Sequence, residues 1–425
     1  MVGIRSHHVE AVVSPGSLFA SRDFRLLLAG QTTSQLGTQV SGVALPLLAV
    51  LTLQASALQI GLINAASVLP VALLGLPAGA WLDRMRRRPV LVASDALRAA
   101  VLATVPVAAA FGVLTLAQLV VVSLLVGIGR VFFDIGYRSY LPSVIGRDQV
   151  LAGNASLELV RASGQIVGPG LGGALVGLLN AANVLAIQTA TFVVSAVTLL
   201  GIRAREPDPV VDPTGPRLAG QIIEGLRYLW RNRLLRATAV ASAASNLSFA
   251  LASAVSILFM SRTLGLSPLV IGLVLGGGSA AVMLGAAFTP RLATAVGSAR
   301  LVWLSLAVTS PLTVLGALAQ PGWGVLLLVG GGTVVGELGQ IIYAITSVSL
   351  RQRVCPDHLL GRVNATMTVL IMGLFPLGAV VGGVLGELVG LRVTLLVAGA
   401  VLAVAPVVLY GALRHFRDVE DATPS

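Results

Sequence analysis

Three pairs of oppositely charged side chains and one further acid lie inside long apolar stretches of this sequence. The pairs are Asp95–Arg98, Arg130–Asp134 and Glu158–Arg161, and the further acid is Glu337. The members of each pair stand three or four residues apart, so both lie on one face of a helix. Charged groups in an apolar surrounding usually pair with one another or line a path for protons and ions. These residues therefore indicate ion pairing or proton transfer, and their similar depth predicts one connected network for the three pairs.

Glu337 differs from the paired acids because no basic residue stands within one helical turn of it. An arginine partner holds a carboxylate in its ionised form, which makes a paired acid a poorer proton carrier at neutral pH. We therefore expect Glu337 to load and release a proton. The alternative for Asp95–Arg98 and Glu158–Arg161 is structural, as self-neutralised pairs that pack near the lipid headgroups.

The stretches that hold these residues are long enough to cross a membrane. Charged residues make up 11% of the chain and the mean hydropathy is +0.92, whereas soluble domains carry about 25% charged residues. A helical span needs about 20 apolar residues, and runs of this kind occur at about 24–53, 57–81, 90–111, 117–141, 151–178, 183–202, 236–261, 267–290, 300–319, 324–348, 362–388 and 392–414. Lipid offers the backbone no hydrogen-bond partners. The sequence predicts an all-α integral membrane protein with twelve transmembrane helices.

The distribution of arginine predicts the orientation. The net charge is +11 and every basic residue except the histidines is arginine. All but five of the arginines fall in the two tails, in alternate loops or in the helix ends beside those loops, and the exceptions are Arg98, Arg130, Arg161, Arg262 and Arg392. This is the positive-inside pattern of membrane proteins, so both termini and the 203–236 segment are expected in the cytoplasm of a cell-membrane protein. The same placement argues against a nucleic-acid partner.

Several classes of chemistry find no support in the sequence. The chain has no lysine, so it lacks the phosphate-binding loop of ATP-hydrolysing proteins. Its four histidines are not gathered into a metal-ligand cluster, its single cysteine allows no intramolecular disulfide, and the N-terminus lacks the apolar core of a signal peptide. We expect no enzyme activity, cofactor or metal, a monomeric state, and energy drawn from an ion gradient.

The two halves of the chain resemble each other at a spacing of 210 to 211 residues. TLQASALQIGL begins at Thr52 and TLGLSPLVIGL begins at Thr263. The pair Gly172-Gly173 corresponds to Gly382-Gly383. Several matches at one spacing predict two six-helix repeats. The expected divisions are a cytoplasmic tail (1–23), a first bundle (24–202), a cytoplasmic linker with an amphipathic helix on the membrane face (203–235), a second bundle (236–414) and a tail (415–425).

Two glycine-containing motifs stand within predicted helices, the first near the end of its helix and the second inside. Gly75 and Gly79, one turn apart, allow another backbone to approach closely, and they precede a charged loop with Asp83, Arg84, Arg87 and Arg88. In GQIVGPGLGG, the residues that favour close helix contact or a bend are Gly164, Gly168, Pro169, Gly172 and Gly173.

These motifs and the repeat resemble the major facilitator superfamily over nearly the whole chain. The resemblance implies that the loop motif is a latch, in which Asp83 meets an arginine and a helix N-terminus of the other half. GQIVGPGLGG looks like the helix 5 motif of the superfamily's antiporters, which implies export against incoming protons. Arg130 is similar to the helix 4 arginine associated with proton transfer in drug antiporters. VLVASDALRA, NASLELV, EGLRYLW and GRVNAT are similar to the branch that contains macrolide and siderophore exporters.

The first predicted helix carries a polar stripe, formed by Gln31, Gln35, Thr38 and Gln39. This stripe is a candidate substrate path. Many relatives have an aspartate at the position of Thr38, so the helix 1 proton site of those relatives lacks its acid here.

These observations favour a proton-coupled exporter of small amphipathic or hydrophobic molecules, such as drugs, antibiotics or siderophores, that works by alternating access. Its expected partners are a small-molecule substrate, protons and the bilayer. An importer or facilitator of a metabolite is the second interpretation, and a transport-inactive membrane sensor or scaffold is a third, from another class.

Overall fold

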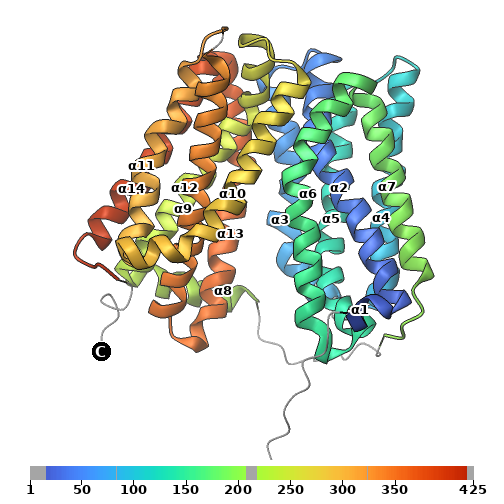
Figure 1. The fold of residues 1–425 in the computed structure, drawn as a ribbon, viewed down its shortest axis with the longest axis horizontal. Helices are drawn as coiled ribbons and strands as arrows, with labels where there is room; N and C mark the ends of the chain where they lie inside the picture. Colours follow the sequence, from blue (N-terminus) through green and yellow to red (C-terminus); the bar gives the residue numbers. More distant parts are fainter. Residues whose placement is uncertain (1–15, 83, 207–217, 323, 419–425) are drawn as a thin grey trace, which may run out of the picture.

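The structure is a computed structural model that describes residues 16–82, 84–206, 218–322 and 324–418. Every regular element in this part of the chain is helical (Figure 1). Twelve helices are long and apolar enough to cross a membrane, as the sequence predicts. They are α2 (Arg22–Leu51), α3 (Ala57–Leu82), α4 (Arg87–Ala110), α5 (Leu116–Ile145), α6 (Val150–Leu179), α7 (Ala181–Gly201), α9 (Arg233–Leu258), α10 (Pro268–Val296), α11 (Ser298–Leu318), α12 (Val325–Val354), α13 (Asp357–Leu388) and α14 (Leu391–Leu413).

Four short elements complete the fold: α1 (Gly16–Ala20), η1 (Arg147–Gln149), α8 (Leu218–Arg231) and η2 (Phe259–Thr263). Helices α2–α7 form one half of the molecule and α9–α14 the other, and the halves stand side by side (Figure 1). The elements α1 and α8 lie at the same end of the bundle, which we call the α8 end. The other end, where α3 and α10 begin, is called the opposite end.

Tight connections reverse the chain between consecutive helices. Asn180 adopts φ 66° between α6 and α7, and its side-chain oxygen accepts the N–H of Asn183 at 3.0 Å. Gly297 and Gly390 adopt φ values of 101° and 89° before α11 and α14. Glycine and asparagine tolerate positive φ, so these residues permit turns short enough to make the neighbouring helices antiparallel.

The two halves meet at the opposite end through backbone contacts between small residues. A Cβ atom at Gly383 of α13 would lie 2.7 Å from the Leu58 Cα atom of α3. A Cβ atom at Gly173 of α6 would lie 2.8 Å from the Gly272 Cα atom of α10. Gly383 is 210 residues after Gly173, so the two contacts are made by corresponding helices of the two repeats.

Hydrogen bonds reinforce this contact between the halves. The Asn64 side-chain amide donates to the Ser253 carbonyl oxygen at 3.0 Å, and the Leu58 N–H donates to the Glu387 carboxylate at 3.3 Å. The Arg262 guanidinium donates to the Val50 carbonyl oxygen at 3.4 Å. All of these groups lie in the part of the bundle nearer the opposite end.

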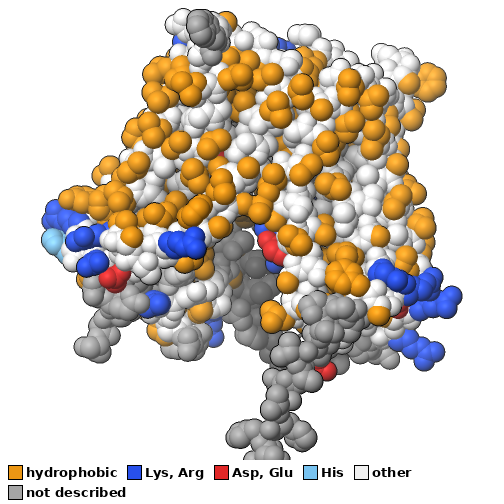
Figure 2. All heavy atoms as spheres, in the orientation of Figure 1, with side chains coloured by type: hydrophobic (Ala, Val, Ile, Leu, Met, Phe, Trp, Pro, Cys, Tyr) orange, Lys and Arg blue, Asp and Glu red, His pale blue; other side chains and the backbone are white. Residues whose placement is uncertain are grey.

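Toward the α8 end the halves separate. A Cβ atom at Gly75 or Gly79 would find no described atom within 4 Å, and Figure 2 shows a cleft between the halves on this side, with acidic and basic side chains inside it. The close backbone approach expected at Gly75 and Gly79 is therefore wrong for this structure, because the cleft separates the halves there. The bundle is open at the α8 end and closed at the opposite end.

The described part of α8 packs against α13, and its expected position on the membrane face stays a prediction. A Cβ atom at Gly225 would lie 2.6 Å from the Arg362 carbonyl oxygen of α13, and the Glu224 carboxylate pairs with the Arg362 guanidinium at 2.5 Å. Leu229 is fully buried in a cluster that includes Leu359 and Val363. Because α13 begins at Asp357, before its apolar run, its first turns offer α8 an apolar partner.

Candidate substrate cavity and charged groups

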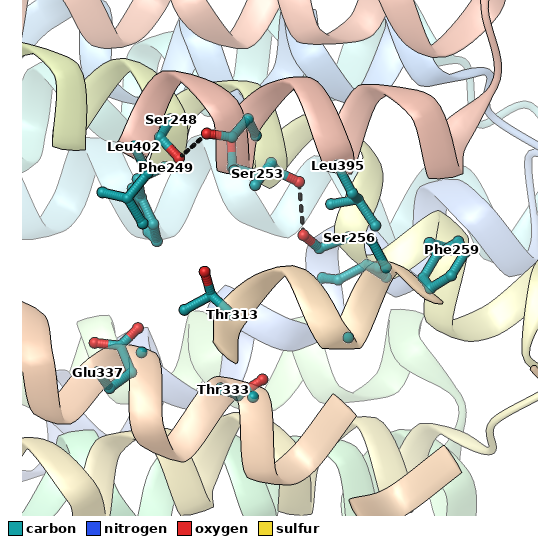
Figure 3. A pocket seen from close by; sticks show the side chains of 18 of the residues that line it. Ser248, Phe249, Ser253, Ser256, Phe259, Thr313, Thr333, Glu337, Leu395 and Leu402 are labelled. Carbon is teal, nitrogen blue, oxygen red and sulfur yellow. Dashed lines mark hydrogen bonds between the residues drawn. The ribbon is translucent and has the colours of Figure 1, made fainter. Parts of the chain in front are cut away.

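A cavity of about 680 Å³ lies between the helices, mostly within the second half (Figure 3). This volume falls in the range of sites for drug-sized molecules, about 300–1,000 Å³. Its wall comes chiefly from α9, α11, α12 and α14, with Asn64 and Ser67 contributed by α3. The polar lining residues are Asn64, Ser67, Ser245, Asn246, Ser248, Ser253, Ser256, Thr313, Thr333, Glu337 and Gln340.

Glu337 is the one ionisable side chain among the lining residues that the structure describes. It lies near the middle of α12 with its carboxylate directed into the cavity (Figure 3). A Cβ atom at Gly278 of α10 would lie 3.3 Å from the Glu337 Cγ atom, so this glycine makes room for the acid. Within the described residues, no basic side chain forms an ion pair with Glu337.

Most hydroxyl groups of the cavity donate their hydrogen to a backbone carbonyl. The donors and acceptors are Ser248 to Ala398, Ser253 to Ala250, Ser256 to Ala252 and Thr313 to Ser310, all at 2.7 Å, and Thr333 to Val329 at 2.8 Å. A hydroxyl oxygen that has donated its hydrogen keeps lone pairs that accept hydrogen bonds. The polar part of the wall therefore offers acceptors.

The Asp95–Arg98 pair forms as its spacing predicts, but it lies outside the cavity. Both side chains are buried, and they form an ion pair within α4. The Arg98 guanidinium stands 4.3 Å from the ring centroid of Phe133 and 4.4 Å from that of Phe192. A Cβ atom at Gly129 would lie 2.7 Å from Arg98 Cγ, so glycine is needed there to admit the arginine. The pair is enclosed between two phenyl rings.

The other two pairs are exposed. Arg130 Nε lies 3.4 Å from an Asp134 carboxylate oxygen, and Arg161 Nε donates to Glu158 at 2.9 and 3.0 Å. In the described part of the chain, no hydrogen bond or ion pair connects these two pairs or joins either of them to Asp95–Arg98. The Arg98 guanidinium nevertheless interacts electrostatically with Asp134 and Arg130. The connected network therefore stays a prediction.

The arginines of the loop motif bind within their own half. The backbone N–H groups of Arg87 and Arg88 donate to the Glu206 carboxylate at 2.5 and 2.6 Å, and Arg88 Nε donates to the Leu199 carbonyl oxygen at 2.9 Å. A carboxylate at a helix N-terminus is a favourable cap. Arg84 is exposed, and Asp83 lies outside the described residues. The latch remains a prediction for a state in which the α8 end is closed.

The glycines of GQIVGPGLGG pack against both halves. A Cβ atom at Gly172 would lie 2.6 Å from the Val40 carbonyl oxygen, and one at Gly168 would lie 3.4 Å from Gln39 Cα. The Pro169 carbonyl oxygen would lie 2.5 Å from a Cβ atom at Gly272 of the second half. At Gly164 the corresponding contact, to Gln39 Cγ, is an ordinary 3.8 Å. Three of the motif's glycines thus allow close helix contact.

The polar stripe of α2 does not line the cavity. Gln31 is buried, Thr38 donates its hydroxyl hydrogen to the Ser34 carbonyl oxygen at 2.8 Å, and Gln35 and Gln39 lie against the Gly164 region of α6. A substrate path along these residues remains a prediction.

Apart from Glu337, the polar residues that line the cavity were missed from the sequence. Ser245, Ser248, Ser253 and Ser256 of α9 and Thr313, Thr333 and Gln340 carry no motif. The recognisable signal was the spacing of the α9 serines, which places small polar groups repeatedly along one helix.

A bundle of twelve spanning helices in two repeated halves, with a cavity between the helices, is the architecture of a major facilitator superfamily transporter. A family model described as transmembrane secretion effector (MFS_3) matches residues 13–425, and the chain belongs to this family. The multidrug efflux pump Tap of Mycolicibacterium fortuitum is 30% identical over 407 residues, which cover 92% of this chain and 94% of that protein. An uncharacterised MFS-type transporter of Bacillus subtilis, YfiS, is 26% identical over 397 residues, 88% of this chain and 89% of that protein.

Solved structures show the same fold. The nucleoside transporter NupG matches with a TM-score of 0.75 at 13% identity, over 92% of this chain and 98% of that one. A bacterial homologue of the iron transporter ferroportin in its inward-facing state matches with a TM-score of 0.74 at 16% identity, again over 92% and 98%. The chain is thus a multi-pass membrane transporter, and the expected membership of the superfamily's drug-exporter branch is confirmed.

Proposed function

We propose that this transporter is a proton-coupled exporter of small amphipathic or hydrophobic molecules and that the Glu337 cavity is its substrate site. The observation that carries the proposal is a drug-sized cavity whose wall contains a single carboxylate without a basic partner among the described residues. Such an acid is able to exchange a proton when its surroundings change. The relatives named multidrug efflux pumps support export as the direction.

The orientation follows from the arginines. The loops and helix ends at the α8 end hold Arg84, Arg86, Arg231 and Arg353, whereas Arg262 and Arg392 lie at the opposite end. The positive-inside rule places the α8 end in the cytoplasm, with both termini on that side. The cavity is then open to the compartment from which an exporter takes its substrate.

Alternating access requires the α8 end to close and the opposite end to open. The contacts that must break include the backbone contacts of Gly173 and Gly383 and the hydrogen bonds from Asn64 to Ser253, from Leu58 to Glu387 and from Arg262 to Val50. Each is a contact between small residues or a single hydrogen bond, so the two halves are able to separate without disrupting a buried charge pair.

Transport into proteoliposomes tests this proposal. For a proton-coupled exporter, protons and substrate are expected to cross the membrane in opposite directions. Proton movement is expected only when substrate is present to move the other way. Substrate and proton moving in the same direction would favour an importer. Substrate movement without proton flux would favour a facilitator, and no movement of any member of a chemically broad panel would favour a sensor or scaffold.

A further inference from the structure

The cavity reaches into the interior of the second half. Helix α9 packs against α14, α14 against α11 and α11 against α12, whereas α9 and α12 contact each other at few points. The four helices therefore form a ring that is open between α9 and α12. We call the space inside this ring the inner chamber, and the cavity residues that define it are Thr313, Gly316, Val329, Gly332, Leu395 and Leu402. Figure 3 shows Leu395 and Leu402 on the side of the cavity away from Glu337.

The first half contains the same ring, formed by α2, α7, α4 and α5, but there side chains fill it. At the repeat spacing of 210 to 211 residues, the six chamber residues correspond in order to Leu102, Val105, Leu119, Val122, Leu185 and Phe192. These six side chains are at most 2% exposed and belong to one hydrophobic cluster. Five of the chamber residues are smaller than their counterparts, and Leu395 is identical to Leu185. The smaller side chains of the second half therefore leave the space of the chamber.

A matching contact in the two rings supports this correspondence. A Cβ atom at Gly129 would lie 2.7 Å from Arg98 Cγ in the first ring, and one at Gly339 would lie 2.6 Å from Thr309 Cβ in the second. Gly339 follows Gly129 by 210 residues, and Thr309 follows Arg98 by 211. The arginine that lies between two phenyl rings in the first half is thus replaced in the second half by a threonine, one helical turn before Thr313.

The wall of the chamber suits an uncharged, apolar group. Thr313 is the one hydroxyl-bearing residue among the six, and it already donates its hydrogen to the Ser310 carbonyl oxygen. Protein interiors are normally close-packed, and an apolar cavity takes up apolar molecules in preference to water. Ser245 also lines the cavity; it is 7% exposed, and its hydroxyl has no hydrogen-bond partner among the described residues. Such a hydroxyl is able to donate to an ether or carbonyl oxygen of a ligand.

We propose that the inner chamber binds an uncharged aryl or short alkyl arm of the substrate, and that Thr313, Gly316, Gly332 and Leu402 limit the size of this arm. An oxygen atom at the base of the arm accepts the hydrogen of the Ser245 hydroxyl. The role of the chamber rests on the proposed function, which identifies the cavity as the substrate site. It adds selection by the size of one apolar group, which proton coupling does not define.

Three uncharged coumarins with one skeleton test the inference: 7-methoxycoumarin, 7-butoxycoumarin and 7-benzyloxycoumarin. Binding to the full-length protein in lipid nanodiscs is measured by equilibrium dialysis with fluorescence detection, and binding to empty nanodiscs is subtracted. The butoxy and benzyloxy compounds are expected to bind about tenfold or more tightly than the methoxy compound, because an added apolar group that fits an apolar pocket commonly changes affinity by this factor.

Variants that carry the first half's residue in the second half fill the chamber. Leu402→Phe and Thr313→Leu should each lower the affinity for the benzyloxy compound about tenfold relative to the affinity for the methoxy compound. Leu402→Ala enlarges the chamber and should raise the affinity for 7-(1-naphthylmethoxy)coumarin, a gain that an unfolded protein cannot produce. Leu315→Phe is the matched control and should behave as wild type, because Leu315 of α11 is 39% exposed and is not among the residues that line the cavity.

Absence of a preference for the longer arms, including absence of binding by all three compounds, would overturn the inference. A preference that survives both Leu402→Phe and Thr313→Leu would overturn it as well. Proton-coupled export of another compound would in either case leave the proposed function standing. Size selection that depends on the chamber, without any proton-coupled export, would refute the proposed function alone.

Discussion

Replacing Gly173 by alanine adds one methyl group at a backbone contact between the two halves. The new Cβ atom would lie 2.8 Å from Gly272 Cα, whereas carbon atoms in ordinary contact stand about 3.5–4.0 Å apart. The helices must therefore move apart by about 1 Å. Overpacking of this kind costs about 1–3 kcal/mol. The cost falls only on the state closed at the opposite end, so the population ratio of the two states shifts about 5- to 150-fold toward the other state.

Distances between spin labels at the α8 end measure this shift. Labels on cysteines introduced at Leu151 of α6 and Gln352 of α12, in a Cys355→Ser background, are expected to move closer in Gly173→Ala. Gly177→Ala is the matched control, because a Cβ atom at Gly177 on the same helix meets no described atom within 4 Å. If Gly173→Ala gives the same distances and transport rate as Gly177→Ala, the glycine contact does not set the balance between the states.

Two further predictions concern stability and orientation. Asp95→Asn leaves the buried Arg98 without its partner and should lower the free energy of unfolding by about 3–5 kcal/mol. Asp134→Asn, in an exposed pair, should lower it by less than about 1 kcal/mol. Thermal unfolding in detergent measures both effects, and equal effects would contradict the assigned burial. Cysteines introduced beside Arg86 or Arg227 should not react with membrane-impermeant thiol reagents in whole cells and should react in inverted vesicles. Labelling from outside the cell would show that the assigned orientation is wrong.

The fold was predictable because the lengths of the apolar runs reflect the thickness of the bilayer, which acts on every span independently. The ends of the helices were less predictable. The run expected at 362–388 belongs to a helix that begins at Asp357, because hydropathy detects the part of a helix in hydrocarbon and not the turns beyond it. The described part of α8 docks near this end of α13, around Leu359, Arg362 and Val363, and hydropathy does not detect such a contact between segments far apart in the sequence.

The candidate site was only partly predictable. Glu337 stood out because an intramembrane acid without a nearby base is visible in one helix alone. The cavity wall depends on which faces of α9, α11 and α12 turn toward one another, and that is set by packing between helices far apart in the sequence. For the same reason the local spacing predicted the Asp95–Arg98 ion pair but not its enclosure between Phe133 and Phe192.

Proton flux in proteoliposomes that contain the Glu337→Gln variant tests the central claim most directly. With an imposed pH gradient and a pH-sensitive dye in the lumen, wild type should couple substrate movement to proton movement, and Glu337→Gln should lose gradient-driven transport while still binding substrate. Asp134→Asn and Glu158→Gln should keep coupled transport. Coupled transport that persists in Glu337→Gln and disappears in Asp134→Asn or Glu158→Gln would contradict the account and place the proton site in the arginine-paired acids.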